Sequence, residues 1–148
     1  MKDIFYYAFY NLCVALFGSY TMMLQRATLY WGRKLVSENG EPSTGLQNAL
    51  TPNSQNYRNI LAPILLISTA IIGIIIFDLI TGILGMIATI ILSAFCGRLF
   101  PKKESEYYYN KMLKILDKKK ELAKKHDEDY KVLAAEEVLT LLNSIKRK

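Results

Sequence analysis

The stretch ILAPILLISTAIIGIIIFDLITGILGMIATIILSAFC, residues 60–96, decides the fold class of this chain. Its 37 residues are almost all Ile, Leu, Ala, Gly, Ser and Thr, and Asp78 is the only charged residue among them. A buried helix of a soluble protein needs no more than about 14 such residues, whereas a bilayer crossing needs roughly 20. The sequence therefore predicts an integral membrane protein, with the lipid bilayer as its first partner.

The length of residues 60–100 favours a helical hairpin over one continuous helix. One unbroken helix of about 40 residues would measure about 60 Å, which is twice the hydrocarbon thickness of about 30 Å. We expect residues 60–77 to cross in one direction, a turn around 78–82, and residues 83–100 to return. Each leg then has about 18 residues, near the lower limit for a crossing. A re-entrant wedge that stops part-way and a single long helix are the alternatives.

A second apolar segment lies near the N-terminus. Residues 4–24, IFYYAFYNLCVALFGSYTMML, hold 21 positions without a charged side chain, which is enough for one crossing. Tyr30 and Trp31 follow it, and such aromatic residues are enriched at membrane–water boundaries. We therefore expect a membrane helix with an interfacial extension over residues 1–36. A helix that lies flat on the bilayer is the alternative.

The segment between these two apolar regions has a different character. Residues 37–59, SENGEPSTGLQNALTPNSQNYRN, are polar and rich in Gly, Pro, Ser and Asn, which are typical of turns and loops. Irregular backbone of this kind cannot enter lipid, because its amide groups would lack hydrogen-bond partners there. We expect an aqueous loop between the first membrane helix and the hairpin.

The net charge of +6 is concentrated toward the C-terminus, where residues 98–148 hold 14 Lys and Arg against 9 Asp and Glu. The basic cluster of Arg98, Lys102 and Lys103 follows the hairpin directly. Cytoplasmic flanks of membrane helices carry such an excess, so three crossings with an external N-terminus place the C-terminus in the cytoplasm. No aromatic–basic motif of a nucleic-acid module accompanies the lysines, and nucleic acid is not an expected partner.

Residues 101–148 form a basic tail that is rich in Lys, Glu, Leu and Ala and contains no Gly, which predicts helix. A break is expected near 126–129. Beyond it, apolar residues recur at a spacing of three and four, as on one face of a helix. Such a stripe requires a partner in water, and the alternatives are the tail's own first half, a second copy of the chain, another subunit or the headgroup surface. This tail stripe consists of Val132, Ala135, Leu139 and Leu142.

Two features of the apolar run suggest specific roles. Asp78 is either an intramembrane carboxylate, as in proton or ion paths, or an ordinary turn former in the headgroup region. The hairpin favours the turn. Gly73, Gly82 and Gly85 are candidates for helix packing, because small residues let membrane helices approach closely.

The sequence lacks the residue sets that catalysis and metal binding need. Cys13 and Cys96 both lie in apolar segments, and His126 is the only histidine, so neither a zinc site nor a disulfide framework is expected. No nucleophile–base set, phosphate loop or pair of metal-binding histidines is present. We expect no catalytic residue, no cofactor and no metal.

These observations predict a non-catalytic membrane subunit with a structural or assembly role in an oligomeric or multi-subunit membrane complex, in contact with other membrane subunits or with copies of itself. Two alternatives come from resemblance. In size, three hydrophobic segments, orientation and basic tail the chain is similar in outline to phage holins, which implies a self-assembling pore former. In hydrophobic length alone it resembles reticulon-type hairpins, which implies membrane shaping. The abundance of Ile, Lys, Tyr and Asn is typical of an AT-rich genome, which could be bacterial, viral or protist. We expect a bacterial inner membrane first and an organellar membrane second.

Overall fold

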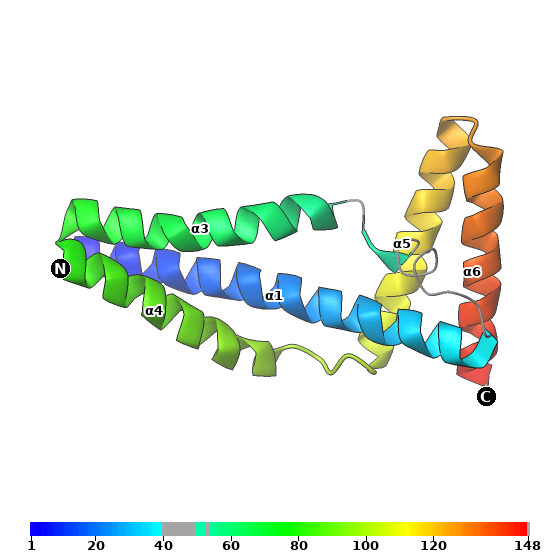
Figure 1. The fold of residues 1–148 in the computed structure, drawn as a ribbon, viewed down its shortest axis with the longest axis horizontal. Helices are drawn as coiled ribbons and strands as arrows, with labels where there is room; N and C mark the ends of the chain where they lie inside the picture. Colours follow the sequence, from blue (N-terminus) through cyan, green and yellow to red (C-terminus); the bar gives the residue numbers. More distant parts are fainter. Residues whose placement is uncertain (40–49, 53, 148) are drawn as a thin grey trace. The chain divides into compact units, whose positions relative to one another are not determined.

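The computed structural model describes residues 1–39, 50–52 and 54–147, and every regular element in these ranges is helical (Figure 1). Three of the helices are long and apolar enough to cross a membrane. The expected all-α class with three hydrophobic segments is therefore confirmed for this part of the chain. The elements are α1 (Lys2–Asn39), α3 (Gln55–Ile76), α4 (Leu79–Cys96), the single turn η1 (Gly97–Leu99), α5 (Glu106–Lys125) and α6 (Asp129–Arg147).

The chain divides into two compact units, and α1 contributes to both of them. The three-helix unit consists of Met1–Met23 and Ser54–Phe100. The tail unit consists of Leu24–Asn53 and Pro101–Lys148. The sequence predicted a membrane helix with an interfacial extension over residues 1–36. In the structure α1 is one uninterrupted helix, and its residues from Leu24 onward group with the tail.

The apolar run is interrupted at Phe77 and Asp78, where α3 ends and α4 begins. Asp78 is the N-cap of α4, with extended backbone dihedral angles and a carboxylate that accepts a hydrogen bond from the Thr81 backbone N–H at 2.6 Å. An N-cap acceptor satisfies an amide that has no partner within the helix. The turn is shorter than the one expected over 78–82, because residues 79–82 are already helical.

The two legs of this hairpin are longer than the sequence suggested. Helix α3 has 22 residues because it begins at Gln55, and α4 with η1 covers the 21 residues of Leu79–Leu99. At 1.5 Å per residue each leg measures about 30 Å or slightly more, which matches the hydrocarbon thickness. The expected loop over 37–59 is correspondingly shorter, since residues 37–39 belong to α1 and 55–59 to α3. Residues 40–49 and 53 lie outside the described residues.

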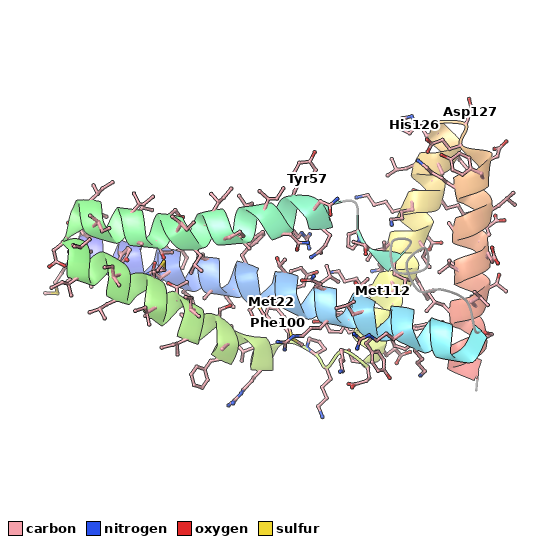
Figure 2. The ribbon with its side chains drawn as sticks, in the orientation of Figure 1. Met22, Tyr57, Phe100, Met112, His126 and Asp127 are labelled. Atoms are coloured by element: carbon pink, nitrogen blue, oxygen red, sulfur yellow. The ribbon has the colours of Figure 1, made fainter. Side chains whose placement is uncertain are left out.

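The three-helix unit carries its large apolar side chains on the outside (Figure 2). Its buried positions are mostly small or hydroxyl-bearing, the reverse of a soluble core. Membrane helices pack in this way, because lipid rather than water covers their outer faces. The buried residues include Ser19, Thr21, Thr69, Gly73, Gly82 and Thr89, and the exposed ones include Ile64, Ile67, Ile71, Ile75, Ile80, Leu84, Ile87 and Ile91.

In the tail unit α5 and α6 pack against each other as a helical hairpin (Figure 1). The connection covers residues 126–128, close to the expected break, and Asp127 has a φ of 54°. Asp tolerates this left-handed conformation better than most residues. The buried side chains have the ordinary apolar character of a water-soluble core. They include Tyr108, Tyr109, Met112, Leu116, Ala123, Ala135, Val138 and Leu142.

Candidate functional site

Asp78 lies at the tip of the α3–α4 hairpin, with an exposed side chain. The hydrogen bond from the Thr81 backbone N–H lowers the pKa of the Asp78 carboxyl, because it stabilises the charged form. The Asp78 carboxylate therefore has a structural partner, the Thr81 backbone N–H in the first turn of α4. Of the two roles considered for Asp78, an intramembrane carboxylate and a turn former, its position between α3 and α4 corresponds to the turn former.

Gly73 and Gly82 bring α3 and α4 together next to that turn. A Cβ atom on Gly73 would lie 2.7 Å from the Cα of Gly82, and a Cβ on Gly82 would lie 2.8 Å from the backbone nitrogen of Ile74. Real Cβ atoms do not approach backbone atoms so closely, so any larger residue would force the helices apart. The two helices thus touch backbone to backbone at this point.

Tyr7 of α1 occupies the space above these glycines, a role that the sequence did not reveal. A Cβ on Gly73 or on Gly85 would lie 2.8 Å from the Tyr7 Cζ. The Tyr7 hydroxyl donates a 2.7 Å hydrogen bond to the backbone carbonyl of Thr69, and its ring packs on Phe77 with 5.7 Å between ring centroids. The three candidate glycines therefore act together with one tyrosine. Gly73 and Gly82 allow the backbones of α3 and α4 to touch, and Gly73 and Gly85 leave room for the Tyr7 ring.

A second tyrosine extends this packing along α1. The Tyr10 hydroxyl and the Ser68 Oγ form a hydrogen bond between α1 and α3. Phe5, Tyr6 and Phe9 on the same stretch are exposed. Residues three apart share a helix face, but Tyr6 and Phe9 have this spacing as well as Tyr7 and Tyr10, so the spacing alone does not tell the packed pair from the exposed pair.

The opposite end of the three-helix unit is basic and aromatic. The Arg58 guanidinium lies 5.5 Å from the centroid of the Tyr20 ring, and that ring packs on Phe100 at 5.6 Å. Arg98 lies over the ring of Phe95 at 5.4 Å. Basic and aromatic side chains are thus paired at this end of the unit, a combination that is typical of the ends of membrane helices.

The candidate basic interface of Arg98, Lys102 and Lys103 is divided between the two units. Arg98 belongs to the three-helix unit, while both lysines belong to the tail unit. There the Trp31 Nε1–H donates a 3.2 Å hydrogen bond to the backbone carbonyl of Lys103, and the Lys103 ammonium lies 5.6 Å from the centroid of the Tyr30 ring. Lys102 is exposed.

The tail stripe is covered by the first half of the tail. Of its four residues, Ala135 and Leu142 are buried and Val132 and Leu139 are half-buried. The Tyr109 hydroxyl of α5 donates hydrogen bonds to the Leu142 carbonyl at 3.3 Å and to the Asn143 Oδ1 at 3.0 Å. Among the four partners considered, the structure thus provides the tail's own first half. The stripe is not an open binding face in this chain.

An ion pair and an aromatic contact complete the tail unit. The Lys120 ammonium lies 2.7 Å from a carboxylate oxygen of Glu136, joining α5 to α6. This hydrogen bond and the charge of Lys120 lower the pKa of the Glu136 carboxyl. The ring of Trp31 packs on Tyr109 of α5 with 5.3 Å between ring centroids. The second half of α1 is attached to α5 through this pair.

The described residues contain no cluster of three His, Cys, Asp or Glu that could hold a metal ion. Cys13 is exposed, Cys96 is buried, and both are free thiols. Comparison with protein-family models, curated proteins and solved structures returned no match for this chain. The contacts of these side chains are those of helix packing within each unit.

Proposed function

We propose that the chain is a non-catalytic structural or assembly subunit of a membrane complex. The observation that carries the proposal is the reversed polarity of the three-helix unit. Uncharged aliphatic side chains cover the outer faces of α3 and α4, while small and hydroxyl-bearing residues fill the interior. Such an outer surface suits lipid and the helices of neighbouring membrane subunits equally well.

The distribution of charge supports an orientation for this subunit. The N-terminus and the Asp78 turn lie at one end of the three-helix unit, because Tyr7 packs beside Gly73 and Phe77. Arg58 and Arg98 lie at the other end. By the positive-inside rule the arginine end faces the cytoplasm. The tail unit is then cytoplasmic, and a bacterial inner membrane is the proposed location.

The lengths of the two legs bear on the alternative roles. Legs of 22 and 21 residues reach across a bilayer, whereas a membrane-shaping wedge uses a hairpin that stops part-way. This favours a spanning subunit over the wedge. For a pore former, several copies would have to line an aqueous path, and the outer faces of α3 and α4 offer aliphatic rather than polar side chains for that purpose.

Native mass spectrometry tests the assembly role. The chain is extracted from its own membrane in a mild detergent through a C-terminal tag, with an unrelated three-span protein bearing the same tag as control. We expect other membrane proteins to accompany this chain, and not the control, in fixed stoichiometry. A defined ring of this chain alone would instead support the pore or membrane-shaping roles, which dye leakage and vesicle tubulation separate. A monomer carrying lipid only would contradict the proposal.

A further inference from the structure

Helix α5 carries a row of lysines on the face that points away from its buried side. Starting from Tyr107, the members of the row follow one another at intervals of three or four residues, so they fall on one face of the helix. Tyr107, Lys114, Lys118, Leu122 and Lys125 are exposed and Lys111 is half-buried. We call this set the lysine row: Tyr107, Lys111, Lys114, Lys118, Leu122 and Lys125.

The charge of the lysine row is not balanced by its own helix. Helix α5 holds seven lysines and three acidic residues, whereas α6 holds three basic and three acidic residues. Glu121 is the acidic residue nearest to the row by helical position. The pKa of Lys111 is lowered, first by burial and then by the positive charge of Lys114. The row is thus a strip of four lysines on one helix face, and within it the charge of Lys114 acts on Lys111.

The strip has the composition of a surface that binds lipid headgroups. Its lysines can extend toward phosphate groups along their flexible chains, while Tyr107 and Leu122 can enter the boundary between headgroups and acyl chains. The row also starts close to the bilayer, since only residues 101–106 separate Tyr107 from Phe100, the last residue of the three-helix unit. A headgroup surface is therefore present at high effective concentration.

We propose that the lysine row of α5 docks on the anionic phospholipid headgroups of the membrane that the three-helix unit spans. Each lysine near such a surface favours the bound state by about fivefold. Four lysines together hold the tail unit on the bilayer at low ionic strength, and the contact weakens as salt screens the charges. This inference requires that the chain is inserted in a bilayer, but it does not depend on the assembly role.

The test uses the full chain in nanodiscs of zwitterionic lipid alone or with about one-third anionic lipid. A water-soluble amine reagent modifies accessible lysines, and mass spectrometry follows each residue separately. Anionic lipid is expected to slow the modification of Lys114 and Lys118 about tenfold, given the strength of lysine–headgroup attraction. Lys131 of α6 should change little. Comparing one residue between two lipid compositions removes differences in intrinsic reactivity.

Paired variants make the test specific to the row. Lys114→Gln with Lys118→Gln should weaken docking about 25-fold, so that anionic lipid no longer protects Lys111 and Lys125. Lys124→Gln with Lys131→Gln removes the same charge outside the row and should retain the protection. Equal modification in both lipids, equal protection of Lys131 and the row, or equal effects of the two double variants would each overturn the proposal.

Discussion

Tyr7 and Thr69, which lie 62 positions apart in the sequence, are joined by a 2.7 Å hydrogen bond from the tyrosine hydroxyl to the threonine backbone carbonyl. Tyr7 is buried, and its ring also fills the space that Gly73 and Gly85 leave open. One side chain of α1 therefore contacts both α3 and α4.

Replacing Tyr7 with Phe keeps the ring and removes the hydrogen bond. Side-chain hydrogen bonds in membrane proteins contribute about 0.6 kcal/mol on average and up to about 2 kcal/mol, so we expect Tyr7→Phe to destabilise the three-helix unit by this amount. Denaturant titration of the chain in detergent micelles measures it. Tyr6→Phe is the control, because Tyr6 is exposed. Equal effects of the two changes would show that the hydrogen bond contributes nothing.

Gly73→Ala should separate α3 from α4. The new Cβ would lie 2.7 Å from the Cα of Gly82, and relieving such overpacking costs about 1–3 kcal/mol. Gly18→Ala is a matched control on α1, because its Cβ would meet the Ser93 Oγ at an ordinary 3.6 Å and Ala favours helix by up to about 1 kcal/mol. Titration in micelles should show opposite signs for the two variants. A neutral Gly73→Ala would contradict the close backbone contact.

The Asp78 cap predicts a dependence on acid. The pKa of Asp78 is lowered in the folded chain, so its contribution to stability is fully present above the unfolded-state pKa of about 3.9. That contribution is lost as the pH falls through the lower folded-state value. Asp78→Asn should keep a cap and remove this acid-dependent loss. The destabilisation by Asp78→Ala relative to wild type should shrink as the pH falls and the Asp78 carboxylate becomes protonated. Thermal unfolding between pH 2 and pH 6 distinguishes the variants.

Asp78→Asn also tests whether the carboxylate carries protons. Because Asp78 caps α4 at the tip of the hairpin, we expect the variant to leave proton flux unchanged in vesicles that contain the reconstituted chain. A pH-sensitive dye inside the vesicles reports the flux. A wild-type flux that disappears in Asp78→Asn would return the residue to the role of an intramembrane proton carrier.

Leu142→Ala should loosen the α5–α6 hairpin. Leu142 is fully buried in the tail unit, and truncating such a leucine costs about 2–5 kcal/mol. Hydrogen exchange of the α5 and α6 amides measures the loss, with Leu133→Ala as control because Leu133 is exposed. If both variants exchanged alike, the proposed covering of the tail stripe by α5 would be wrong.

Composition and length were enough to predict the all-α class and three hydrophobic segments, because the hydrocarbon thickness fixes how many apolar residues a crossing requires. The interruption near Asp78 followed from the same argument. The helix starts did not. Residues 55–59 are polar, and polarity predicts a loop, yet they form the first turn of α3. Polar side chains exclude a segment from lipid but do not prevent it from being helical in water.

The partners of individual side chains were harder to predict than the segments. Gly73, Gly82 and Gly85 were chosen for their small size, but their spacing cannot reveal that the third member of the contact is Tyr7 of another helix. The tail stripe shows the same difficulty. Its periodicity indicated a face that requires a cover, and only the folded chain identifies α5 as that cover.

The division of α1 between the two units has a consequence for biosynthesis. Each unit joins a segment of α1 to a segment made much later, and domains generally form as their residues emerge from the ribosome. The first half of α1 can close its contacts once Phe100 has been translated, but Trp31 must wait for Tyr109. During that interval the indole ring of Trp31 lacks its contact with Tyr109, so the second half of α1 is accessible to chaperones and proteases. Helix α5, which is synthesised much later, then covers this ring.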